Sequence, residues 1–337
     1  MVKRERWRLM ALCVLAIYLG WVVLASLRAD DAHLITIDGS STVFPITEAA
    51  AEEFQRAHRG QFKVIVGISG TGGGFKKFCR GETDIQDASR PITAEEREVC
   101  RRNGIGYYEL PIAYDALTIV VSRRNSWVDS MTILELKRAW EPSAQGTVSR
   151  WNQIRPDWPD APLKLFGAGS DSGTFDYFTK VVMGRPKASR GDYTASEDDN
   201  TLVQGIARDQ YALGYIPFGY YESNQHKIRA VPVDAGSGPR APSRQTVEAG
   251  TYQPLARPLL IYVNGTSANR SDVRTFVESY LSDAARFASE VNFVPLPAEV
   301  YALAAGHFRT GRVGTVFSAG SSAGVPLLEV LQREAAL

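Results

Sequence analysis

Three short segments of this chain combine glycine with serine or threonine where a strand pattern gives way to a helix pattern. The first N–H groups of a helix lack partners and lie at the positive end of its dipole, so such junctions bind anions. Glycine lets the backbone approach a ligand, and hydroxyls add short donors. The pattern predicts an oxyanion site; alternatively, each hydroxyl only caps its own helix. The segments are Gly39-Ser40-Ser41-Thr42, Ser69-Gly70-Thr71-Gly72-Gly73 and Ser170-Asp171-Ser172-Gly173-Thr174.

Two charged residues are expected near these junctions. Arg90 follows a short strand and precedes a helix, which places it at the same sheet edge. A guanidinium there can bind a tetrahedral oxyanion through two parallel N–H groups; the alternative is a surface ion pair. Asp115 is expected to hold Arg90 or to orient a hydroxyl, and the alternative is an ordinary loop carboxylate.

Several other chemistries are excluded by spacing. A phosphate-binding P-loop needs Gly-Lys-Ser/Thr, but Gly74 is followed by Phe75. The dinucleotide pattern fails at the same phenylalanine, and Ser172 lacks the flanking glycines of a nucleophile elbow. No cofactor and no metal are therefore expected, because the four histidines do not show metal-ligand spacing. These are His33, His58, His226 and His307.

Strands and helices alternate along the chain, which predicts an α/β fold with a largely parallel sheet. Leu34 to Asp38 and Lys63 to Ile68 are expected strands, each followed by a glycine turn. Helices are expected at Val43 to His58 and Phe75 to Arg80. Glycine turns that follow such strands lie at the carboxyl ends, where open α/β sheets bind ligands.

Two long apolar segments, at 113–122 and 256–263, are candidate crossovers between two lobes. Lobe 1 would then comprise residues 31–118 and 258–337, with lobe 2 inserted as residues 119–257. A length of 337 residues is compatible with two such units. The alternative is one large α/β domain with both segments as central strands.

The net charge of +1 conceals a basic leader. Residues 1–29 hold five of the 38 Lys and Arg but one of the 37 Asp and Glu, so the remainder has 33 against 36 and a net charge of −3. Leu9 to Leu27 carries no charge, which predicts a signal peptide within residues 1–30. Cleavage after Ala25 or Ala29 and retention as a membrane anchor both remain open. Either outcome places the rest of the chain outside the cytoplasm. Separately, its near-neutral net charge disfavours nucleic-acid binding.

The cysteines fit an exported chain. Cys13 falls in the leader. A lipoprotein signal has a small residue before its cysteine, and this chain has Leu12 there, so lipidation of Cys13 is not expected. Cys79 and Cys100 remain, and an even pair in an oxidising compartment favours a disulfide. The alternative is two buried free thiols.

Five motifs in order resemble the PstS-like family, the substrate-binding proteins of phosphate ABC importers. The resemblance implies a two-lobed periplasmic-binding-protein (type II) fold with phosphate in the cleft between lobes joined by two crossover strands. It further implies a monomer that docks on a membrane permease. The motifs are Asp38-Gly39-Ser40-Ser41-Thr42-Val43-Phe44-Pro45, Gly67 to Phe75, Asp87-Ala88-Ser89-Arg90-Pro91, Asp171-Ser172-Gly173-Thr174-Phe175 and Arg257-Pro258-Leu259. The implied phosphate ligands are Ser41, Thr42, Ser69, Gly70, Thr71, Gly72, Arg90, Ser170, Ser172, Gly173 and Thr174.

The chain departs from the best-known members of that family at two positions. They have an aspartate in the third loop, where Ser89 is followed here by Arg90. They also have an arginine shortly before the Ser-Gly-Thr turn, where this chain has Ala168. A carboxylate can accept the proton of hydrogen phosphate, which sulfate lacks. Asp115 and Asp171 are the candidates for that task.

The sequence thus predicts reversible high-affinity binding of inorganic phosphate outside the cytoplasm, without catalysis. One alternative is an exported phosphohydrolase or transferase, which needs a nucleophile activated by a nearby base. The other is a binding protein or sensor for a different tetrahedral oxyanion.

Overall fold

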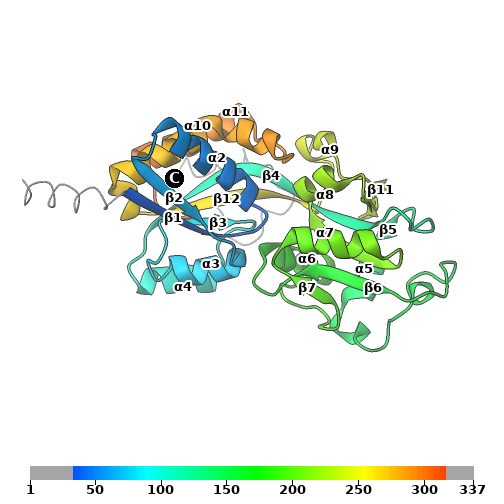
Figure 1. The fold of residues 1–337 in the computed structure, drawn as a ribbon. Coiled ribbons are helices and arrows are strands. Elements are labelled where there is room, and N and C mark those ends of the chain that lie inside the picture. The colour runs from blue at the N-terminus through cyan, green and yellow to red at the C-terminus, as the bar shows by residue number, and fades with distance from the viewer. Residues whose placement is uncertain (1–32, 316–337) are drawn as a thin grey trace, which may run out of the picture.

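The structure is a computed structural model that describes residues 33–315, and the predicted leader lies outside them. It has two lobes that lie side by side (Figure 1). The first lobe is built from both ends of the described chain: β1 (His33–Gly39), α2 (Phe44–Ala57), β2 (Phe62–Val66), α3 (Gly70–Phe78), β3 (Ile85–Ala88), α4 (Ala94–Arg102), β12 (Ala256–Asn264), α10 (Ser271–Glu290) and α11 (Ala298–Thr310).

The second lobe holds the middle of the chain, and β4 (Tyr107–Ser122) runs through both lobes. Within residues 33–315, no helix is both long and apolar enough to cross a bilayer. The elements of the second lobe are β5 (Met131–Thr132), α5 (Ile133–Trp140), β6 (Lys164–Ala168), α6 (Gly173–Met183), β7 (Thr194–Ser196), α7 (Asp199–Arg208), β8 (Ala212–Pro217), α8 (Phe218–Asn224), β9 (Ile228–Ala230), β10 (Val233–Asp234), β11 (Pro239–Arg240) and α9 (Arg244–Glu248).

The main sheet is mixed rather than largely parallel. Its strand order is β2-β1-β3-β12-β4-β8-β6-β7, and β9 pairs with β4. The strands at each end of this order are parallel, whereas β12 is antiparallel to both β3 and β4. Along β4, the partner changes from β12 at Ala116 to β8 at Leu117. The two long apolar segments therefore pair with each other in the first lobe, and β4 alone continues into the part of the sheet that belongs to the second lobe.

Each lobe has its own apolar core. In the first, alternating Ile35 and Ile37 of β1 pack with Phe54 of α2 and Phe276 of α10, while Phe75, Phe78 and Tyr262 fill the opposite face of the sheet under α3 and α4. In the second, aromatic side chains dominate: Phe178 and Tyr215 stack at 3.9 Å between ring centroids, and Trp140 meets both edge-on. Two separately packed cores allow the lobes to move relative to each other as rigid bodies.

Helix α3 begins at Gly70, five residues earlier than the predicted Phe75, so the glycine run is its first turn. Glycine is a poor helix former, but side chains do not fit here. A Cβ at Gly74 would lie 2.0 Å from Oε1 of Gln86, and Gly70 has a φ of +74°. Close packing against β3 and the second lobe thus overrides local helix propensity.

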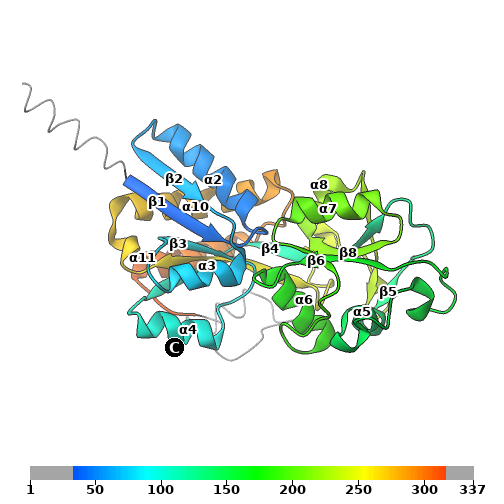
Figure 2. The same cartoon turned by 60° about the horizontal axis from the view of Figure 1, so that its bottom comes forward.

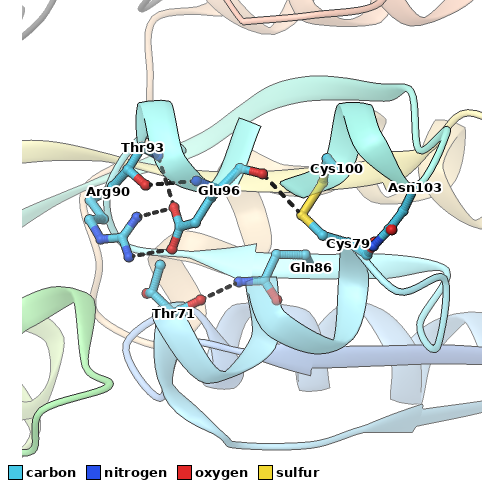
Figure 3. Close-up of a disulfide and its surroundings, with 8 residues drawn as sticks. All are labelled: Thr71, Cys79, Gln86, Arg90, Thr93, Glu96, Cys100 and Asn103. Carbon is cyan, nitrogen blue, oxygen red and sulfur yellow. Dashed lines mark hydrogen bonds and ion pairs between the residues drawn. A yellow bond between two sulfur atoms is a disulfide. The ribbon is translucent and has the colours of Figure 1, made fainter. Parts of the chain in front are cut away.

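The predicted disulfide is present and joins Cys79, at the end of α3, to Cys100 of α4 (Figure 3). The two cysteines are 21 residues apart in the sequence. Replacing both with serine is expected to lower the free energy of unfolding by about 3 kcal/mol, because the open loop regains entropy in the unfolded chain. Urea denaturation measures the loss.

Reducing the wild-type protein with a thiol provides the control for that experiment. Reduction breaks the same bond without changing the sequence, so it should shift the urea midpoint in the same direction. Equal midpoints for oxidised wild type and the double serine variant would show that the bond does not stabilise the native state.

Candidate functional site

The three predicted turns converge where the lobes meet. Gly39 of β1 is paired with Asp87 of β3, so the carboxyl ends of these strands are adjacent. The starts of α2 and α3 follow β1 and β2, and α6 of the second lobe approaches α3 across the junction (Figure 2). The strand–turn–helix connections therefore direct helix N-termini from both lobes toward one place.

Buried hydroxyl groups meet at this junction. The hydroxyls of Thr42 and Thr174 are 3.1 Å apart across the two lobes. Within the first lobe, the hydroxyls of Thr71 and Ser89 are 3.2 Å apart. Both lie against Gly173, where an added Cβ would be 2.5 and 2.4 Å away from them. Two hydroxyls thus lie against Gly173, and a second pair meets at the adjacent Thr174, at the start of α6.

Arg90 lies at the edge of this cluster and connects the lobes. Its Nε donates to Asp176 of α6 at 2.7 Å. Its two terminal nitrogens donate to both oxygens of Glu96 at 2.8 Å, as Figure 3 shows. One of them also donates to the Pro91 carbonyl. Burial opposes the charge, yet the hydrogen bond and charge of Glu96 and the charge of Asp176 raise the pKa of Arg90. Four of its five N–H groups are used in these bonds, and Nη2 lies 3.7 Å from a Cβ position at Gly72.

Asp115 holds a different arginine from the one expected. It accepts two hydrogen bonds from Arg257, at 2.9 and 3.0 Å, and one from the Phe218 backbone. The expectation that it holds Arg90 is wrong, because β12 runs beside β4 and places Arg257 directly opposite Asp115. Arg257 then donates to the carbonyl of Gly173 and the hydroxyl of Thr174. This buried pair therefore positions the turn at Ser170 to Thr174, and not the loop that contains Arg90.

The second and third turns contact each other directly. The Gly72 N–H donates to the Asp171 carbonyl at 2.9 Å, and a Cβ at Gly70 would lie 2.6 Å from that same oxygen. Lys76 forms an ion pair with the Asp171 carboxylate, and the Asp171 N–H donates to Glu197. Glycine at position 70 is therefore needed for the second lobe to pack against this turn.

Not every predicted ligand points into the hydroxyl cluster. Ser170 is exposed. Ser69 does not cap α3 but donates to Asp38 at 2.6 Å, which also pairs with Lys77. Ser172 caps α6 by accepting the Thr174 N–H, as the helix-capping alternative expects, and keeps its own O–H as a donor. The remaining predicted residues occupy the interface: Ser41, Thr42, Gly70, Thr71, Gly72, Arg90, Gly173 and Thr174.

Sequence reasoning missed four residues that organise this interface. Glu96 forms a capping box with Thr93 at the start of α4 and also binds Arg90. Arg257 stood in a recognised motif beside a crossover, which was the available signal. Asp176 and Asp199 gave no signal, because each one's contact to the first lobe depends on tertiary structure.

The arrangement suits a tetrahedral oxyanion. Backbone N–H groups, hydroxyls and guanidinium N–H groups all donate, and they are buried where water cannot compete. Among residues 33–315, no group of three or more His, Cys, Asp or Glu side chains is placed to hold a metal ion.

Residues 26–284 match the PBP superfamily domain. The chain is 50% identical over 308 residues to protein SphX of Synechocystis, covering 91% of each chain. It is 37% identical over 268 residues to the phosphate-binding protein PstS of Staphylococcus saprophyticus, covering 78% of this chain and 81% of that one. A solved structure of a possible phosphate binding protein from Planctomyces limnophilus superposes with a TM-score of 0.63 at 41% identity, covering 83% of this chain and 99% of that one.

The fold and the interface of hydroxyls and helix starts define a two-lobed binding protein of the PBP superfamily, to which the chain belongs. Within that superfamily it is a member of the PstS-like phosphate-binding protein family.

Proposed function

We propose that this protein binds inorganic phosphate in the cleft between its lobes and delivers it to an ABC-type importer. The observation that carries the proposal is the meeting of two hydroxyl pairs at the start of α6, Thr42 with Thr174 and Thr71 with Ser89, with Arg90 beside them. Relatives named as phosphate-binding proteins support it. Because their names describe binding, we further propose that the chain performs no catalysis.

The energetics of such a site are adequate. Phosphate is strongly hydrated, so the cleft must replace nearly all of its hydrogen bonds. Each bond to a charged group contributes about 1.5–3 kcal/mol net, and a micromolar dissociation constant requires about 8 kcal/mol. A handful of donors from both lobes therefore reaches that value after the cost of closing the lobes.

We propose that the ligands come from both lobes and that the cleft closes by rotation about the crossover. The first lobe would supply Thr42, Thr71, Arg90 and the N–H groups near Gly72, while Ser172 to Thr174 would complete the set. The division at 118/119 and 257/258 is supported by the change of partner along β4 beside Ala116. Ligand bound by one lobe would then draw the other onto it.

We propose that the mature protein acts outside the cytoplasm, as a monomer that docks on a membrane permease. The disulfide between Cys79 and Cys100 supports an oxidising compartment. The basic start and the uncharged run to Leu27 support export.

Competition calorimetry tests the proposed ligand. Phosphate should bind with micromolar or tighter affinity, arsenate should compete with it because it has the same shape and protonation, and sulfate should compete weakly. Tighter binding of sulfate than of phosphate would support the alternative, a binding protein for a different tetrahedral oxyanion. Steady release of phosphate from an ester in a colorimetric assay would instead identify an enzyme.

Replacing Arg90 with alanine is expected to weaken phosphate binding by about ten- to a hundredfold. That range corresponds to losing one charge-assisted hydrogen bond, and the ion pair with Asp176 across the lobes is lost with it. Calorimetry measures the change. Arg101→Ala is the matched control, since Arg101 is exposed and pairs with Glu98 on the same helix. Unchanged affinity in Arg90→Ala would remove Arg90 from the site.

A further inference from the structure

Ser41 is attached to the second lobe at two points. Its hydroxyl donates to the carboxylate of Asp199, at the start of α7, over 2.9 Å. Its carbonyl accepts a hydrogen bond from the hydroxyl of Tyr220, on α8, over 3.0 Å. Because Ser41 belongs to the first lobe and both partners belong to the second, these two bonds exist only when the lobes are together. The first predicted turn thus carries a latch as well as helix N–H groups.

The carboxylate in this latch is almost completely buried, with 2% of Asp199 exposed. The charged and titratable groups that face it come from four elements: Asp115 of β4, Arg257 of β12, Asp198 of α7 and Tyr220 of α8. Two of these are carboxylates, and the arginine is bonded to Asp115, Gly173 and Thr174 instead. With the lobes together, Asp199 is therefore out of contact with water and has no ion pair among these groups.

We propose that Asp199 is a positioning residue that takes up a proton when the lobes close, and that it couples phosphate capture to proton uptake through Ser41. The proposal rests on the function proposed above, because phosphate is the ligand expected to drive closure. A neutral carboxyl is the state expected for an acid moved from water into a buried site beside another carboxylate.

The direction of the coupling follows from the environment of Asp199. Burial raises its pKa to about 7, the Ser41 hydrogen bond lowers it, and the charge of Asp115 raises it. In the open form the carboxylate is hydrated, and its pKa returns toward the ordinary 3.8. The closed form is thus favoured by protons. Its advantage is complete at pH below the ordinary value of 3.8 and has been lost once the pH has risen through about 7, with affinity falling by up to about tenfold for each pH unit between these two values and no further change above them.

The test counts protons taken up for each phosphate bound. Calorimetry in pairs of buffers with different heats of ionisation gives that number between about pH 6 and pH 8. Phosphate itself titrates in this range, so the informative quantity is the difference between wild type and Asp199→Asn. We expect the variant to take up nearly one proton fewer at the acidic end, with the difference disappearing toward the basic end.

Asp198→Asn is the matched control, since it makes the same chemical change one residue earlier. Asp198 is exposed and caps α7 through the Asn200 N–H, a role that asparagine also performs. It should keep the proton uptake of wild type at the acidic end, with a midpoint at slightly lower pH because the charge of Asp198 raises the pKa of Asp199. An identical proton count in wild type and Asp199→Asn would overturn the proposal.

A second variant covers the case in which Asp199→Asn fails to bind. Removing the hydroxyl in Ser41→Ala deletes the bond that favours the charged carboxylate, so proton uptake should persist with its midpoint moved to higher pH. A midpoint that stays in place or moves to lower pH would also overturn the coupling. If wild type shows no phosphate binding at any pH, it is the proposed function itself that fails.

Discussion

Asp115→Ala is expected to lower the free energy of unfolding by about 3–5 kcal/mol, because it leaves the guanidinium of Arg257 buried without a counter-charge. Both side chains of the pair are buried: the exposed fractions are 1% for Arg257 and 0% for Asp115. The same change removes the acceptor of the Phe218 N–H. Chemical denaturation monitored by far-ultraviolet circular dichroism measures the loss.

Two controls separate the effect of charge from that of a missing side chain. Asp283→Ala removes an exposed carboxylate from a surface ion pair with Arg286 and should change stability by less than about 1 kcal/mol. The double variant Asp115→Leu with Arg257→Met removes both charges and should cost less than the single alanine variant. If the double variant is the less stable of the two, the unpaired charge is not the cause.

Gly173→Ala is expected to weaken phosphate binding by about a thousandfold. The added methyl group would lie 2.4 Å from the Ser89 hydroxyl and 2.5 Å from that of Thr71, so the second lobe would be unable to close onto the first. A site formed by one lobe loses two or three hydrogen bonds, each contributing about 1.5–3 kcal/mol. Calorimetry measures affinity, and small-angle scattering with phosphate shows whether the lobes remain apart.

The variant should leave each lobe folded, because Gly173 is the first residue of α6 and its φ is outside the region that only glycine favours. Gly306→Ala is the control: it adds the same methyl group within α11, where nothing lies within 4 Å. Wild-type affinity and a compact scattering profile for Gly173→Ala would show that closure does not require this contact.

Local patterns were sufficient for the alternating elements and the three turns. The period of apolar residues placed β1 and α2 within a few residues of their observed bounds. Thr93 and Glu96, three residues apart, form a capping box at the start of α4. The disulfide was predicted from cysteine number and compartment. The elements, turns and capping box depend on interactions within a few residues of each other, and the disulfide depends on the compartment that the whole chain enters. Both can therefore be predicted from the sequence.

Helix α3 shows where local reasoning fails. A run of glycines predicts a loop because glycine loses most backbone entropy on becoming helical. At Gly74 the backbone of α3 instead packs so closely on Gln86 that a side chain would be excluded. Contacts with residues far along the chain decided the start of this helix.

By itself, the sequence determined that this chain is an α/β protein with hydroxyl-rich helix starts at the carboxyl ends of strands, because hydrophobic period and turn chemistry are local. Only the tertiary structure decided which charges meet. Arg90 pairs with Asp176 across 86 residues, Asp115 pairs with Arg257 across 142, and Ser41 binds Asp199 across 158. Each pairing requires two lobes or two crossover strands to be in place. A buried charge needs a partner, and tertiary packing decides which polar or charged group lies within hydrogen-bond distance of it.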